Sequence, residues 1–188
     1  MFFSGIQYTV DGLEHLDPNS QYVFMANHES GFDILLVFAT LPYKLVFIAK
    51  TELKKIPFLG WAMQMGKHIF VDRKNHKAAL SSMEEARGSL EQYPRSIMIF
   101  PEGTRSLDGH LRSFKKGGVV LAIQTRLSLV PLGIIGTFDI AKKGSFILRP
   151  QPILLKVGKP IDVSLFSFED RDRVTDILYN DVVNLRSS

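Results

Sequence analysis

A histidine and an aspartate separated by four residues lie in the stretch NHESGFD, which begins at Asn27. A carboxylate beside an imidazole fixes the ring's tautomer and supports its protonated form, so the other ring nitrogen can act as a general base. On a continuous helix, residues five apart point about 140° away from each other. A catalytic pair therefore requires His28 in a loop and Asp33 in the first turn of a helix.

The same stretch has a simpler interpretation. Ser30 is followed three residues later by Asp33 and then by an apolar run, which matches a helix capping box. A cap explains Ser30 and Asp33 without any chemistry, but it leaves His28 without a role. Both interpretations stand at this point.

A second polar stretch, FPEGTRS, covers residues 100–106. It is typical of a turn after a strand, with a solvated arginine. It is equally typical of an anion site. Gly103 allows a close backbone approach, Thr104 offers a hydroxyl, and Arg105 can bind phosphate through parallel hydrogen bonds. Glu102 could orient that guanidinium or accept a hydrogen bond from a substrate hydroxyl.

Two further cations follow apolar segments. Arg73 ends GKHIFVDR and would be a useful second cation for a phosphate, whereas Lys50 ends VFIAK. Each also has an ordinary explanation, because Arg73 can be the polar exit of a buried strand and Lys50 can belong to a basic helix face.

Short apolar segments alternate with helical ones along the chain, and polar candidates follow four of the apolar segments. This alternation predicts an α/β fold with a largely parallel, mixed central sheet flanked by helices. Ligands bind beyond the carboxyl ends of the strands in such sheets. The expected strands are 22–27, 46–50, 68–73, 96–100, 129–136 and two within 146–158. The expected helices are 31–40, 52–66 with a break or start at Pro57, 77–92, 114–126 and 168–185.

Length and composition limit the possibilities. The chain has 188 residues, a net charge of +4 and no cysteine, which predicts one domain over residues 1–188 and excludes thiolate metal sites and a cysteine nucleophile. The basic charge suits an anionic partner. No secretory signal and no transmembrane helix are predicted.

The segment KIPFLGWAMQMG, from Lys55 to Gly66, is rich in large apolar residues. We favour a helix that packs into the core. The alternative is a surface helix whose Phe58, Trp61, Met63 and Met65 enter a lipid interface while Lys54 and Lys55 meet anionic headgroups.

Taken together, four blocks in order resemble the lysophosphatidic acid acyltransferase family of glycerolipid acyltransferases. They are NHESGFD with His28 and Asp33, GKHIFVDR with Arg73, FPEGTRS, and LVPLGI around Val130. The resemblance extends from Tyr22 to about Ile135. Many relatives carry a hydrophobic or amphipathic segment ahead of the first block, and we expect no such segment among the residues before Asn27. Either the chain is truncated there or membrane contact rests on the region from Pro57 to Met65.

The resemblance implies transfer of an acyl group from acyl-CoA or acyl-carrier protein to the free hydroxyl of lysophosphatidic acid, giving phosphatidic acid. His28 is then the general base, Asp33 supports it, and backbone N–H groups near Val130 could bind the oxyanion. The absence of cysteine and of a Gly-x-Ser-x-Gly elbow agrees with direct transfer. The residues expected to bind substrate are Lys50, Arg73, Glu102, Gly103, Thr104 and Arg105.

No metal and no cofactor beyond the acyl donor are expected. The expected partners are a lysophospholipid, the acyl donor and a membrane surface, with no nucleic acid, and the expected location is peripheral on the cytoplasmic face of a membrane. Acceptors such as glycerol 3-phosphate or another lysolipid remain alternatives. So do a metal-dependent phosphohydrolase, with His28, Glu29, Asp33 and Glu102 as ligands, and a non-catalytic binder of anionic lipid.

Overall fold

The computed structural model describes residues 5–72, 87–90, 92–140 and 148–187. Seven strands form one sheet in the order β1-β7-β6-β2-β5-β3-β4. The strands are β1 (Tyr8–Asp11), β2 (Val23–Ala26), β3 (Leu45–Lys50), β4 (Ile69–Val71), β5 (Ser96–Ile99), β6 (Leu129–Ile135) and β7 (Ile153–Val157).

The sheet is mixed. Strands β6, β2, β5, β3 and β4 run parallel to one another, and β7 pairs antiparallel with β6. The edge strand β1 is parallel to β7. The α/β fold with a largely parallel, mixed sheet is therefore confirmed.

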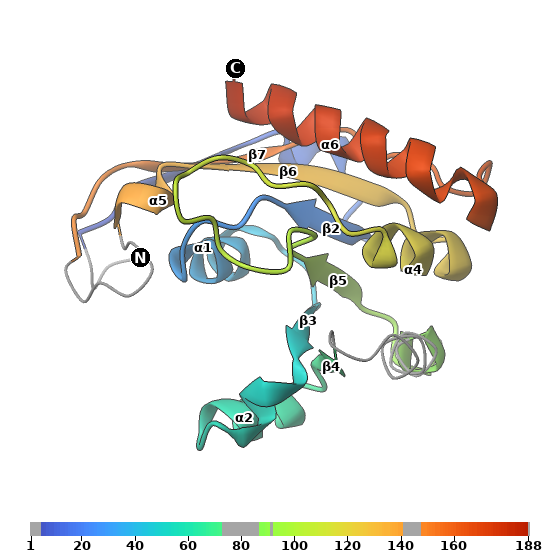
Figure 1. The fold of residues 1–188 in the computed structure, drawn as a ribbon, viewed down its shortest axis with the longest axis horizontal. Coiled ribbons are helices and arrows are strands. Elements are labelled where there is room, and N and C mark those ends of the chain that lie inside the picture. The colour runs from blue at the N-terminus through green and yellow to red at the C-terminus, as the bar shows by residue number, and fades with distance from the viewer. Residues whose placement is uncertain (1–4, 73–86, 91, 141–147, 188) are drawn as a thin grey trace.

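Both faces of the central strands are buried, as in parallel sheets covered by helices. Along β2, Val23 and Met25 pack on one side, against α4 (Gly117–Thr125) and α6 (Arg171–Ser187). Phe24 and Ala26 pack on the other side, with α1 (Phe32–Thr40) and α5 (Thr137–Ile140). This alternation with a period of two gives a three-layer arrangement, and Figure 1 shows α1 and α6 on opposite sides of the sheet.

Helix α6 covers the sheet because its apolar residues recur at helical spacing. Val174, Leu178 and Val182 are fully buried, and they lie on one face of the helix. The chain enters this helix through the turn η3 (Phe168–Asp170), where Ser167 and Asp170 form a capping box. In Figure 1, α6 lies over β6 and β7.

The segment between β3 and β4 extends from the side of the sheet that is farthest from β1 and β7. We call this segment the flap. It consists of the 3₁₀ turn η2 (Thr51–Lys55) and α2 (Leu59–Met65). Pro57 separates the two, as predicted. Gly60 allows them to pack closely, because a Cβ on Gly60 would lie 2.3 Å from the Lys54 carbonyl oxygen.

The interpretation of this segment as a core helix is wrong. Phe58 is 78% exposed, Trp61 61% and Met65 85%. Their large side chains face away from the core although the segment has a core-like composition.

Other differences concern short or irregular elements. The sequence did not predict β1 or the single turn α5. Only one strand, β7, occurs within the described part of 146–158, because residues 148–152 are not in a strand. Of the helix predicted for 77–92, residues 87–90 are helical, and most of the rest lies outside the described residues.

Candidate active site

The polar candidates gather along the edge formed by the carboxyl ends of β2, β5 and β3, because these strands are parallel. His28 follows β2, the stretch from Phe100 to Arg105 follows β5, and Lys50 ends β3. The shared edge expected from the sequence is therefore present. Arg73 lies outside the described residues, so its predicted role remains a prediction.

His28 and Asp33 are in direct contact. Nδ1 of His28 lies 2.7 Å from Oδ2 of Asp33, and the Asp33 side chain is completely buried while that of His28 is 15% exposed. A carboxylate can only accept a hydrogen bond, so the neutral imidazole carries its proton on Nδ1. Nε2 of His28 then keeps the lone pair that a general base requires.

Asp33 is held by the loop that precedes its helix. The same oxygen, Oδ2, accepts hydrogen bonds from the backbone N–H groups of Glu29 at 2.7 Å and Ser30 at 2.9 Å. These bonds hold the carboxylate in position beside the imidazole. The bond from the Ser30 N–H to Asp33 is one of the two hydrogen bonds of the capping box predicted for Ser30 and Asp33.

The N-cap differs in detail from the prediction. The N-cap residue of α1 is Gly31 rather than Ser30, while the Ser30 hydroxyl accepts a hydrogen bond from Phe32 N–H at 3.4 Å. Cap and dyad are thus not alternatives, since one carboxylate contacts both the loop backbone and the imidazole.

Glu102 connects the loops that follow β2 and β5. Its Oε1 accepts the backbone N–H of His28 at 2.7 Å, and its Oε2 accepts the backbone N–H of Arg112 at 3.0 Å. Burial raises the pKa of Glu102, and these two hydrogen bonds oppose that rise. The carbonyl of His28 in turn accepts the N–H of Ser106 at 2.8 Å. The backbone of His28 is therefore fixed on both sides by the FPEGTRS loop.

The imidazole of His28 stacks on Phe100, with ring centroids 4.0 Å apart. Beyond it lies a cavity of about 550 Å³, which also contains Gly103, Thr104, Arg105 and Lys50. Its other walls are largely apolar and come from α1, β3 and the flap. They include Ile34, Phe38, Phe47, Ile48, Leu53, Leu59, Ala62 and Met63.

This cavity combines an imidazole, two cations and a largely apolar wall. Gly103 has a φ of +78°, a backbone conformation that glycine adopts without strain. Such a site suits an amphipathic substrate with an anionic group at one end.

Comparison with known proteins agrees with this arrangement. A family model described as Acyltransferase matches residues 7–135, well over half of the chain. The chain belongs to the acyltransferase family.

Several relatives of this chain are named 1-acyl-sn-glycerol-3-phosphate acyltransferase. One from Limnanthes douglasii is 37% identical over 176 residues, covering 94% of this chain and 62% of the relative. One from Cocos nucifera is 38% identical, covering 86% and 52%. One from Borreliella burgdorferi is 30% identical, covering 97% and 73%. The chain thus spans between about half and three quarters of the length of these relatives.

A solved structure shows the same fold. It is that of the 1-acyl-sn-glycerophosphate (LPA) acyltransferase PlsC from Thermotoga maritima, with a TM-score of 0.79 and 32% identity, covering 96% of this chain and 72% of that one.

The expectation that backbone groups near Val130 contact the reacting atoms has no support in the structure of this chain. Val130 is fully buried within β6, opposite Phe24 of β2, and it does not line the cavity. The LVPLGI block builds the core and supports the site indirectly. Asn27, for example, exchanges hydrogen bonds of 2.8 Å with both backbone groups of Ile134 in β6.

Sequence reasoning did not assign Phe100, His68 or Arg186 to the site. Phe100 and His68 line the cavity, and Nδ1 of His68 accepts the N–H of Phe47 at 2.9 Å. Glu29 is buried against Arg186 of α6. No local pattern connects Glu29 with Arg186, which are 157 residues apart.

Proposed function

We propose that this acyltransferase moves a fatty acyl group from acyl-CoA or acyl-carrier protein to the free hydroxyl of lysophosphatidic acid, producing phosphatidic acid. The observation that carries the proposal is the contact between His28 and the fully buried Asp33, with the imidazole bordering a largely apolar cavity that Arg105 and Lys50 also line. The names of the relatives agree with this choice of acceptor.

In the proposed reaction, Nε2 of His28 accepts the proton of the acceptor hydroxyl. The oxygen attacks the thioester carbonyl, and a tetrahedral intermediate forms. Its collapse breaks the carbon–sulfur bond, and His28 returns the proton to the leaving thiolate. Asp33 stabilises the imidazolium that exists between these steps. No acyl-enzyme is formed, because the acyl group passes directly between the two substrates.

The cations of the cavity are proposed to bind the acceptor's phosphate. Arg105 can donate two parallel hydrogen bonds, and Lys50 supplies a point charge on the adjacent strand end. Gly103 and Thr104 shape the same wall of the cavity. Arg73 retains its proposed place as a further cation. Glu102 contributes by holding the loops together, since both of its oxygens already accept backbone N–H groups.

We further propose that the flap contacts the membrane surface. Leu53, Leu59 and Met63 of the flap line the cavity, while Phe58 and Trp61 are exposed. Lys54 and Lys55 beside them are exposed cations that suit anionic headgroups. A lipid substrate could then reach the cavity from the interface without crossing water. No helix in the described ranges is long and apolar enough to cross a membrane.

The decisive assay follows thiol release from acyl-CoA with and without lysophosphatidate, in the presence and absence of EDTA. Acceptor-dependent release that resists EDTA and is lost in His28→Ala is the expected result. Undiminished release in His28→Ala would overturn the assignment of the base. A panel of lysolipids and glycerol 3-phosphate, analysed by mass spectrometry, identifies the acceptor.

The alternatives have their own outcomes in the same experiment. Phosphate release abolished by EDTA would favour the metal-dependent hydrolase, although the described residues contain no group of three or more suitable ligands placed to hold a metal. Lipid binding without turnover would favour a non-catalytic binder. Thiol release from acyl-carrier protein and not from acyl-CoA, in a parallel assay with each donor, would identify the carrier protein as the donor.

A further inference from the structure

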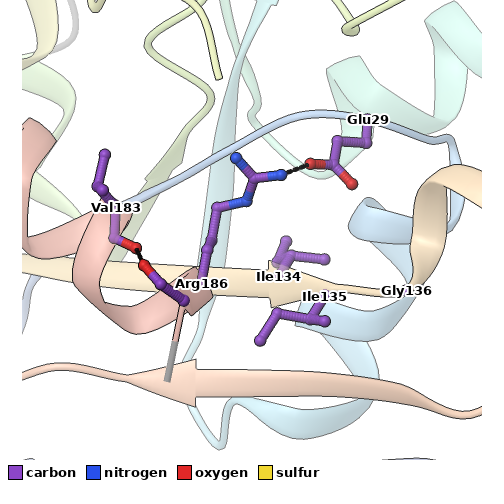
Figure 2. A pocket seen from close by; sticks show the side chains of 7 residues that line it. Glu29, Ile134, Ile135, Gly136, Val183 and Arg186 are labelled. Carbon is purple, nitrogen blue, oxygen red and sulfur yellow. Dashed lines mark hydrogen bonds and ion pairs between the residues drawn. The ribbon is translucent and has the colours of Figure 1, made fainter. Parts of the chain in front are cut away.

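A smaller cavity of about 290 Å³ lies between the loop carrying the dyad and the end of α6. It is lined by Glu29 and by Ile134, Ile135, Gly136, Val183, Arg186 and Ser187. Figure 2 shows Arg186 reaching from α6 to the carboxylate of Glu29. The guanidinium donates a short hydrogen bond to Glu29 Oε1 and another of 3.0 Å to the carbonyl of Gly109. Neither His28 nor Asp33 lines this cavity.

Glu29 connects this cavity to the dyad. Its backbone N–H donates to Oδ2 of Asp33, the oxygen that contacts His28. Its side chain, 5% exposed, accepts hydrogen bonds from Arg186 and from Nδ2 of Asn27 at 3.2 Å. The two ends of one residue thus join α6 to the Asp33 carboxylate.

The surroundings of Glu29 make its charge costly without a cation. Burial, together with the charges of Asp33 and Glu102, raises the pKa of Glu29 to about 7, while Arg186 and the hydrogen bond from Asn27 oppose the rise. The carboxyl groups of Asp33 and Glu102 both lie near enough to Glu29 to disfavour its charge. A buried carboxylate that loses its cation becomes protonated or moves toward water.

The position of Arg186 is set by close packing of α6 on β6. A Cβ on Gly133 of β6 would lie 2.8 Å from Cβ of Leu185, so only glycine permits this approach without displacement. Val182, one turn before Arg186, is fully buried. The last turns of α6 are thus firmly seated where the guanidinium can reach Glu29.

We propose that Arg186 is a positioning residue for the dyad. Its guanidinium anchors the Glu29 side chain and thereby keeps the backbone N–H of Glu29 on the Asp33 carboxylate that orients His28. The catalytic consequence rests on the role proposed above for His28 and Asp33. The anchoring itself does not, and can be measured separately.

The experiment compares Arg186→Met with Arg173→Met, which removes the same charge from an exposed position of the same helix. We expect kcat to fall about 10- to 100-fold in Arg186→Met, because a displacement of about 1 Å in a catalytic group has effects of this order. KM should stay within about twofold, since Arg186 does not line the substrate cavity. Arg173→Met should match the wild type in both.

Backbone amide exchange provides a readout that needs no turnover. The amides of Glu29 and Ser30, which both bind Asp33, should exchange faster in Arg186→Met and at the wild-type rate in Arg173→Met. Faster exchange in a chain without transferase activity would support the anchoring while overturning the proposed function. Unchanged exchange together with unchanged kcat would overturn the anchoring.

A double variant separates positioning from general destabilisation. Glu29→Gln combined with Arg186→Met leaves no unpaired carboxylate, so it should be more active than Arg186→Met alone. The kcat of Arg186→Met relative to wild type should also fall as pH rises and the unpaired Glu29 ionises, whereas the double variant should show a flat ratio. A double variant no better than Arg186→Met, with the same flat ratio in both, would contradict the proposal.

Discussion

The dyad site, which comprises the loop after β2, the first turn of α1 and the FPEGTRS loop, differs from the flap in how it uses polar and apolar groups. In the dyad site, Asp33 and Glu102 are buried and accept backbone hydrogen bonds from His28, Glu29, Ser30 and Arg112. In the flap, Phe58, Trp61 and Met65 are exposed. The dyad site buries carboxyl groups and the flap exposes large apolar side chains. Both differ from the usual preference of folded proteins, which expose charged groups and bury apolar ones.

Each departure has a physical explanation in the proposed reaction. Buried charges cost free energy unless they are hydrogen-bonded, but they hold the imidazole in one orientation without reorganisation. Exposed aromatic side chains are unfavourable in water and favourable in a lipid interface. The proposed chemistry is therefore assigned to the dyad site, and the proposed contact with lipid to the flap.

The strongest way to break this separation is Asp33→Asn. The amide keeps the size of the side chain but cannot hold His28 as a carboxylate does, so we expect kcat to fall by about 10²- to 10⁴-fold. Binding of vesicles should not change. Combining Asp33→Asn with His28→Ala should add little further loss, because the pair acts as a unit. Independent, additive losses would contradict the dyad.

Glu102→Gln tests how far the position of the His28 backbone depends on the Glu102 carboxylate. One backbone N–H, from His28 or Arg112, would then face an amide donor, which costs about 1–3 kcal/mol of unfolding free energy. Urea denaturation measures this loss, and kcat should fall with it because the backbone of His28 is released. Glu169→Gln, at an exposed position, is the matched control and should behave as wild type.

Phe58→Ser and Trp61→Ser test the flap. Full burial of a large apolar side chain contributes about 1.5–3 kcal/mol, so each change should weaken binding to anionic vesicles by about tenfold or more. Turnover of a short-chain, water-soluble acceptor should be unaffected. Leu165→Ser removes a side chain that is 84% exposed outside the flap, and it should leave vesicle binding unchanged. If Leu165→Ser weakened vesicle binding as much as Phe58→Ser and Trp61→Ser do, the proposal that the flap contacts the membrane would be contradicted.

The smallest expected effect is the pH dependence contributed by Glu29. Its pKa is raised from 4.5 to about 7 in the folded protein, so the folded state binds more protons than the unfolded state between these values. The contribution of Glu29 to the unfolding free energy is therefore greatest below pH 4.5 and is lost as pH rises through 7. Glu29→Gln should gain stability relative to wild type over that interval, measured by urea denaturation. Parallel pH curves for the two proteins would contradict the raised pKa.

The sequence predicted the elements that are defined by local pattern. β2, β3, β5 and β6 are short, buried apolar runs, and α1 and α6 carry an apolar face. By contrast, β1 is largely exposed and acquires its strand through pairing with β7, far along the chain. Such an element has almost no local signal. The flap was misjudged for a related reason, because composition does not say which apolar residues remain exposed.

The amino-acid sequence by itself determined which chemistry is available and where along the chain it lies: a histidine, carboxylates and cations at the ends of apolar segments, and no thiol. Parallel pairing then makes those ends neighbours, which pattern alone could anticipate. Only the tertiary structure decided that Glu102 binds backbone, that the flap exposes its aromatic side chains, and that Arg186 meets Glu29. These contacts join residues up to 157 positions apart, and their geometry depends on how whole layers pack rather than on any local spacing.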